Sequence, residues 1–90
     1  MRLNIQRFTL TGSEHAFVFD KERSQYVVKN FTEDDVYVSF EQGAPQNESI
    51  KIPTMMGQVC FLQDTSPSSN VYSTNVIYVT GTGEVEVQQI

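Results

Sequence analysis

The chain has one cysteine, Cys60, and one histidine, His15, the residue types of a nucleophile and its general base. A thiolate nucleophile needs a nearby histidine and a third group that orients it. Cys60 lies within Val59-Cys60-Phe61-Leu62, a setting typical of a small buried hydrophobic residue. We therefore interpret Cys60 as structural, and a single cysteine excludes an internal disulfide.

Metal and cofactor sites have little support in the sequence. One cysteine and one histidine cannot supply the three or four ligands that zinc usually takes from a protein. The acidic turns Asp20–Arg23 and Glu33–Asp35 lack the spacing of a calcium loop and are interpreted as solvated. Gly81-Thr82-Gly83 is too short for a dinucleotide fingerprint and precedes a strand pattern. We expect no metal, no cofactor and no catalysis.

The elements that would position any functional group are predicted to be strands. Val, Ile and Thr are abundant, whereas Ala and Leu, the residues that favour helices, are scarce. Short segments with a period of two recur between turn residues, which favours an all-β fold, a small antiparallel β-sandwich of about seven to eight strands. The predicted strands are Gln6–Thr11, His15–Asp20, Gln25–Asn30, Val36–Gln42, Ser49–Pro53, Gln58–Gln63, Asn75–Thr80 and Glu84–Gln89.

The segments between these strands carry typical turn residues. Gly12-Ser13 and Thr80–Gly83 are predicted to be hairpin connections, because glycine takes a positive φ without steric cost. Pro45 cannot donate to a strand ladder, so it ends the fourth strand. The stretch Asp64–Ser73 is predicted to be either a mobile surface loop that could carry a binding surface or a plain connection between sheets.

Ninety residues make a single domain, residues 1–90. The alternation changes phase near the start, because Leu3 and Ile5 share one parity whereas Phe8 and Leu10 share the other. Either a bulge lies near Gln6-Arg7 or residues 1–7 form a separate N-terminal arm. We favour the arm, which could dock on a neighbouring subunit; a frayed terminus is the alternative.

Charge and composition limit the partners. Eleven acidic and six scattered basic residues give a net charge of −5, which disfavours nucleic acids and anionic membranes. The longest apolar runs, such as Val76–Val79, are far too short to span a bilayer. The first eight residues lack the apolar stretch of a secretory signal, so we expect synthesis and folding in a cytoplasm. A surface rich in Ser, Thr, Asn and Gln suits contacts with proteins or glycans.

Apolar positions in excess of one core predict contacts with a partner. The segments His15–Asp20 and Asn75–Thr80 carry apolar residues in both phases, so one face of each would require a second subunit. Met55-Met56, between Pro53 and Gly57, could make adaptable contacts with a partner, although we favour the alternative of a loop lid over the core. Met55, Met56 and Phe8 are therefore the candidate partner contacts.

Three segments carry a resemblance to a known class of proteins. Met1–Phe8, Tyr26–Thr32 followed by Val36–Ser39, and Ile77–Val87 resemble short virion proteins of tailed bacteriophages that infect Gram-positive hosts. The resemblance implies a small β-sandwich in a virion, as a head-decoration, head-fibre or tail component. It implies a homo-oligomer in contact with other virion proteins, made and folded in the bacterial host cytoplasm. No functional residue of that class carries over, because the matching positions belong to strands and turns.

A carbohydrate-binding β-sandwich module is the alternative function. Tyr, Asn and Gln on a sheet face would suit a glycan on a host surface. The absence of Trp counts against a platform on which sugars stack.

Overall fold

The computed structural model describes residues 4–61 and 74–90, and this part of the chain forms eight strands and one short 3-10 helix. The predicted all-β sandwich is confirmed. The expected loop Asp64–Ser73 lies outside the described residues. The elements are β1 (Ile5–Thr11), β2 (His15–Arg23), β3 (Gln25–Asn30), β4 (Val36–Ser39), η1 (Gln46–Glu48), β5 (Ile50–Ile52), β6 (Gly57–Phe61), β7 (Thr74–Thr80) and β8 (Thr82–Gln89).

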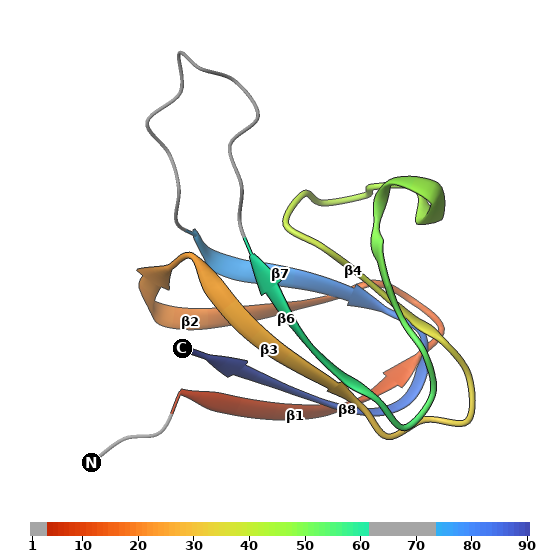
Figure 1. Ribbon diagram of the computed structural model, residues 1–90. Coiled ribbons are helices and arrows are strands. Elements are labelled where there is room, and N and C mark those ends of the chain that lie inside the picture. Colours follow the sequence, from red (N-terminus) through yellow and green to blue (C-terminus); the bar gives the residue numbers. More distant parts are fainter. Residues whose placement is uncertain (1–3, 62–73) are drawn as a thin grey trace.

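The strands form two four-stranded antiparallel sheets that pack face to face (Figure 1). Sheet I has the order β1-β8-β3-β6 and sheet II the order β2-β7-β4-β5. Along the chain the antiparallel pairs are nested, since β1 pairs with β8, β2 with β7, β3 with β6 and β4 with β5. A nested ribbon folded over into two layers is the topology of an eight-stranded jelly roll.

The core fills the space between the two sheets. Alternation along each strand sends one phase inward, so that Phe17 and Phe19 of β2 are buried while Ala16 and Val18 face outward. Burying one such side chain contributes about 1.5–3 kcal/mol. The buried apolar residues are Leu10, Phe17, Phe19, Tyr26, Val28, Val36, Val38, Ile52, Cys60, Ile77, Val79, Val85 and Val87.

The prediction that Gly12-Ser13 and Thr80–Gly83 are hairpin connections is wrong. Each carries the chain from one sheet to the other, because β1 and β8 belong to sheet I whereas β2 and β7 belong to sheet II. The two corners lie against each other, since the Gly12 N–H donates to the Gly81 carbonyl at 2.8 Å. A Cβ on Gly81 would lie 2.7 Å from Cγ1 of Val36, so close packing of this corner requires glycine. Turn residues allow a reversal, but the burial of apolar faces decides which strands pair.

Residues 5–7 do not form the expected arm. Ile5, Gln6 and Arg7 pair in regular register with Gln88, Val87 and Glu86, so there is no bulge either. The change of phase has a simpler cause. Gln6 occupies the inward position and its side-chain amide donates to the Val18 carbonyl of sheet II at 2.6 Å, which leaves Ile5 on the outer face. Residues 1–3 lie outside the described part of the chain.

The fourth strand is shorter than expected and ends at Ser39 rather than Gln42. The Ser39 hydroxyl donates to the Glu41 carbonyl and accepts from the Glu41 N–H, both at 2.9 Å. A serine side chain that bonds the backbone two residues on competes with strand pairing. This local turn therefore replaces the last predicted residues of the strand.

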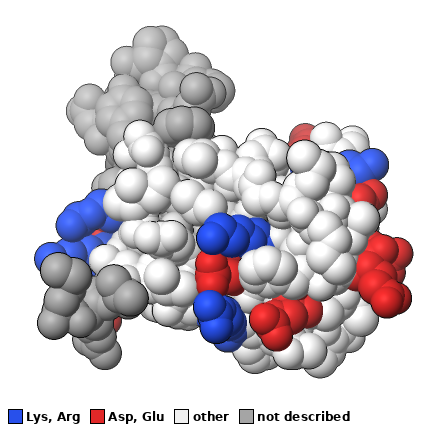
Figure 2. All heavy atoms as spheres, turned by 60° about the horizontal axis from the view of Figure 1, so that its bottom comes forward, with Lys and Arg blue, Asp and Glu red and all other residues white. Residues whose placement is uncertain are grey.

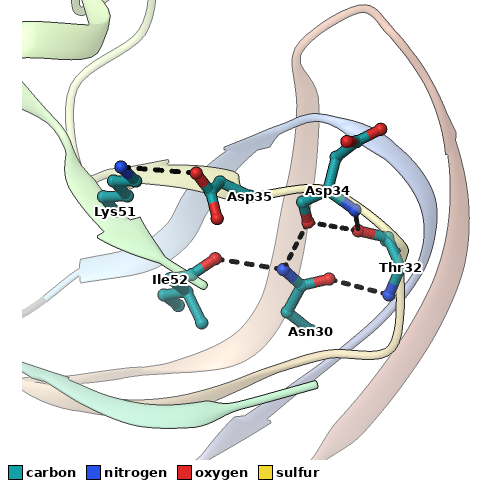
Figure 3. Close-up of polar contacts among 6 residues, drawn as sticks. All are labelled: Asn30, Thr32, Asp34, Asp35, Lys51 and Ile52. Atoms are coloured by element: carbon teal, nitrogen blue, oxygen red, sulfur yellow. Dashed lines mark hydrogen bonds and ion pairs between the residues drawn. The ribbon is translucent and has the colours of Figure 1, made fainter. Parts of the chain in front are cut away.

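One end of the sandwich is held by a buried polar cluster around Asn30 (Figure 3). The Asn30 side-chain amide donates to the carbonyls of Asp34 and Ile52, at 2.8 and 3.0 Å, and its oxygen accepts from the Thr32 N–H at 2.8 Å. The Thr32 carbonyl accepts from the Thr54 hydroxyl. The loops from β3 to β4 and from β5 to β6 are therefore joined through side chains, and they lie together at the lower right of Figure 1.

We predict that Asn30→Ala lowers the free energy of unfolding by about 2–3 kcal/mol, because two carbonyls and one N–H lose a buried partner. Urea unfolding measures the change. Asn47→Ala is the matched control, since Asn47 is exposed and should change stability by less than about 0.5 kcal/mol. Equal losses in the two variants would contradict the role given to Asn30.

Candidate functional site

Three large apolar side chains are exposed on the end of the sandwich that Asn30 holds. Phe31 is 45% exposed, Met55 67% and Met56 55%, and we call these three residues the loop-end surface. The Asn30 N–H donates to the Met56 carbonyl at 2.8 Å, so the two loops run side by side. The favoured interpretation of Met55-Met56 as a lid over the core is wrong, because both methionines face solvent.

Met55 has a backbone conformation that glycine usually takes. Its φ is +61°, at the third position of a turn closed by the Met56 N–H and the Pro53 carbonyl at 3.3 Å. A left-handed conformation costs an L-residue with a Cβ about 1–2 kcal/mol. An exposed side chain gains no core packing in return. Strain of this kind at an exposed apolar residue is typical of functional positions.

The loop-end surface is held rigidly by the residues beneath it. Phe31 lies between two buried residues, Asn30 and Thr32, whose side chains form hydrogen bonds, and its own N–H donates to the Glu84 carbonyl at 3.1 Å. A Cβ on Gly83 would lie 2.8 Å from Cγ2 of Thr32, so the β7–β8 corner also packs closely here. A surface fixed before binding loses little conformational entropy when a partner docks.

Acidic side chains border the loop-end surface. Glu33, Asp34 and Glu84 are exposed, and no ion pair among the described residues includes them. Asp35 is paired with Lys51 at 3.3 Å (Figure 3). Figure 2 shows acidic groups gathered toward the end of the molecule that carries these loops, while basic groups lie mainly at the centre and the opposite end.

The outer face of sheet I is covered by a row of charges. Glu86 is only 7% exposed because Arg7 and Lys29 flank it across the neighbouring strands, with Arg7 Nε 2.8 Å from Oε1 and Lys29 Nζ 3.5 Å from Oε2. The hydrogen bond from Arg7 is the main cause that lowers the pKa of the Glu86 carboxyl, and Lys29 adds to it. The charged side chains at the centre of this face therefore cover one another, whereas Val59 on the edge strand β6 is 40% exposed.

The outer face of sheet II is apolar by comparison. Val18 is 57% exposed, and it pairs with Val76, which is half-buried. The exposed charges on its strands are Asp20, Lys21, Glu22 and Arg23, two acidic and two basic residues at the end of β2, and Lys51 of β5, which pairs with Asp35. We call the following outward residues the sheet II face: Ala16, Val18, Val76, Tyr78, Tyr37 and Ser39.

Phe8 does not join the methionines. It lies on β1, at the opposite edge of sheet I from β6, and its ring stacks on His15 with centroids 3.6 Å apart. Phe17 meets both rings edge-on. Phe8 is nevertheless 39% exposed, and the contacts with His15 and Phe17 cover the rest of its side chain.

Cys60 and His15 do not form a catalytic pair. Cys60 is buried on β6 of sheet I, whereas His15 lies on β2, an edge strand of sheet II on the opposite side of the sandwich. Burial raises the pKa of the Cys60 thiol to about 11. The interpretation of Cys60 as a small buried residue is confirmed.

Phe31 is the residue that sequence reasoning missed. Its neighbours Tyr26, Val28 and Asn30 are inward, so Phe31 falls in the outward phase of the same strand pattern. This alternation of inward and outward residues was the signal from which the exposure of Phe31 could have been predicted. Its position beside Met55 and Met56 depends on the pairing of β3 with β6, which connects residues far apart in the chain.

Within residues 4–61 and 74–90 no group of three or more His, Cys, Asp or Glu side chains could hold a metal ion. The same residues contain no helix of the length and apolar character needed to cross a membrane. Comparison with protein-family models, with curated proteins and with solved structures found no match.

We predict that the ion pairs of Glu86 make stability depend on pH. Because folding lowers the Glu86 pKa, the contribution is present above the ordinary glutamate value and is lost as pH falls from about 4.3 through the lower folded pKa. Urea unfolding at several pH values should show a smaller acid loss for Glu86→Gln than for the parent. Glu48→Gln, at an exposed position, should keep the parent profile.

We predict that a thiol reagent at about pH 8 labels Cys60 only when the protein unfolds, because the thiol is buried and protonated. Labelling followed against urea concentration should track the unfolding transition. Cys60→Ala should cost about 1 kcal/mol of stability. Rapid labelling of the native protein would contradict a passive role.

Proposed function

We propose that this protein is a non-catalytic structural protein of a phage-type virion, and that it assembles as a homo-oligomer through the sheet II face. The observation that carries the proposal is the apolar strip of exposed Ala16 and Val18 and half-buried Val76, on a sheet over which residues 4–61 and 74–90 place no second layer. A single two-layer domain can bury only the inner face of each sheet. A second copy would cover the strip and remove its contact with water.

The charge distribution supports a second copy as the partner. The exposed charges on the strands of sheet II are balanced, because the end of β2 carries two acidic and two basic residues, Asp20–Arg23, and Lys51 pairs with Asp35. Two such faces can therefore meet without strong repulsion. Self-complementary packing about a twofold axis also lets the same residues be used on both copies.

The size of the face sets the strength of the association. Four strands about 4.8 Å apart and about 20 Å long give roughly 400 Å² of flat area for each subunit. A standard stable interface buries about 800 Å² for each partner. The association should therefore be reversible and depend on concentration, and an array of many copies on a particle would strengthen it.

The fold adds support by analogy alone. Jelly rolls occur in viral capsid proteins, and also in lectins and cupins, so topology does not choose among these functions. The virion assignment accordingly rests on the resemblance of the strand and turn segments together with an assembly face.

A carbohydrate-binding module is the second candidate. Tyr37 and Tyr78 lie near each other on the sheet II face, because Tyr37 pairs with Thr80 and Tyr78 with Ser39. Half-buried tyrosines beside hydroxyl groups could hold a sugar. A glycan array separates the two functions, since the virion proposal expects no retained glycan.

We predict that light scattering at tens of micromolar protein shows a mass above the monomer, and that Val18→Glu returns the protein to monomer. The introduced charge would be desolvated in the interface. Val59→Glu is the matched control, because Val59 is 40% exposed on β6 of sheet I and should leave the mass unchanged. A parent protein that is monomeric under these conditions would overturn the homo-oligomer.

A further inference from the structure

We propose that the loop-end surface, Phe31, Met55 and Met56, binds a polypeptide segment of a partner protein in which apolar side chains are bordered by lysine or arginine. This surface is distinct from the sheet II face. It lies at the end of the sandwich where two loops meet, whereas the sheet II face covers the flat side of the other layer. The inference therefore goes beyond self-assembly.

The apolar character of the surface is not explained by the fold. The core is complete without these three side chains, which are all exposed. Met55 in addition keeps a side chain at a φ of +61°, where glycine would be free of strain. Flexible thioethers adapt to varied apolar partners. The hydrogen bonds of the Asn30 side chain, one of them from the Thr32 N–H, hold the loops that carry these residues.

The acidic border decides which partner fits. Glu33, Asp34 and Glu84 are exposed without an ion pair among the described residues. The cations on adjoining strands already have partners, since Arg7 and Lys29 pair with Glu86 and Lys51 pairs with Asp35, and Glu84 is only attracted to Arg7 from a longer distance. A second copy would bring the same carboxylates together and be repelled. Nucleic acid and anionic membranes would be repelled for the same reason. A basic, partly apolar segment would be attracted and oriented.

The test uses an immobilised array of random 12-residue peptides probed with the full-length protein. We expect the retained peptides to be enriched in sequences that combine Leu, Ile, Phe or Met with Lys or Arg. Binding should weaken as salt is raised, because the border charges are exposed. Glycans immobilised on the same array should not bind the protein.

Two variants assign the binding to this surface. Met55→Gly removes the thioether and relieves the positive φ, so it should leave the melting temperature unchanged or higher while lowering the binding of selected peptides about tenfold or more. The double variant Glu33→Lys with Glu84→Lys should remove the preference for basic peptides. Val18→Glu, on the sheet II face, should leave peptide selection unchanged even where it changes the mass of the assembly.

Several outcomes would overturn the inference. An array with no enriched peptides, or with enriched acidic peptides, would show that no such segment is recognised. A Met55→Gly variant that melts lower would mean that the side chain supports the fold. Retention of glycans in place of peptides, or loss of peptide binding in Val18→Glu, would show that the binding site is on the sheet II face.

Discussion

A two-layer sandwich has four sheet faces and can bury only two of them against each other. Sheet I covers the centre of its outer face with its own side chains, because Arg7 and Lys29 close over Glu86. On sheet II the part of the chain that the structure describes provides no comparable cover, and Val18 is exposed. The difference between the two outer faces follows from the same limit on domain size, and it gives the molecule a polar side and a side suited to contact with a partner.

The loop end depends on a different interaction, the buried amide of Asn30. One side chain satisfies two carbonyls and one N–H, so the loops on either side are fixed in relation to each other. Exposed residues on such loops keep their positions without contributing to the core. The molecule thus has one flat apolar face that is nearly neutral and one smaller apolar end that is acidic, and the two suit different kinds of partner.

Alternation along the strands was enough to predict the fold class and most strand positions, including β3 from Gln25 to Asn30. It could not predict which strands pair, because pairing depends on contacts between residues far apart in sequence. The corners at Gly12 and Gly81 therefore looked like hairpins. The methionines were identified as a pair, but their exposure and their neighbour Phe31 depend on how β3 lies beside β6. The prediction of an N-terminal arm was wrong because Gln6, a polar residue, occupies an inward position, where its side chain forms a hydrogen bond.

The nested pairing has a consequence for how the chain reaches this state. β8 lies between β1 and β3, so sheet I cannot be completed until residues through Gln89 have been synthesised, although β3 and β6 can pair earlier. Loops that close over the whole chain make folding slow relative to helical domains of the same size. The edges of β1 and β3 that face β8 therefore stay unpaired during synthesis, and a nascent chain of this topology can pair with its neighbours on a polysome until β8 has been made.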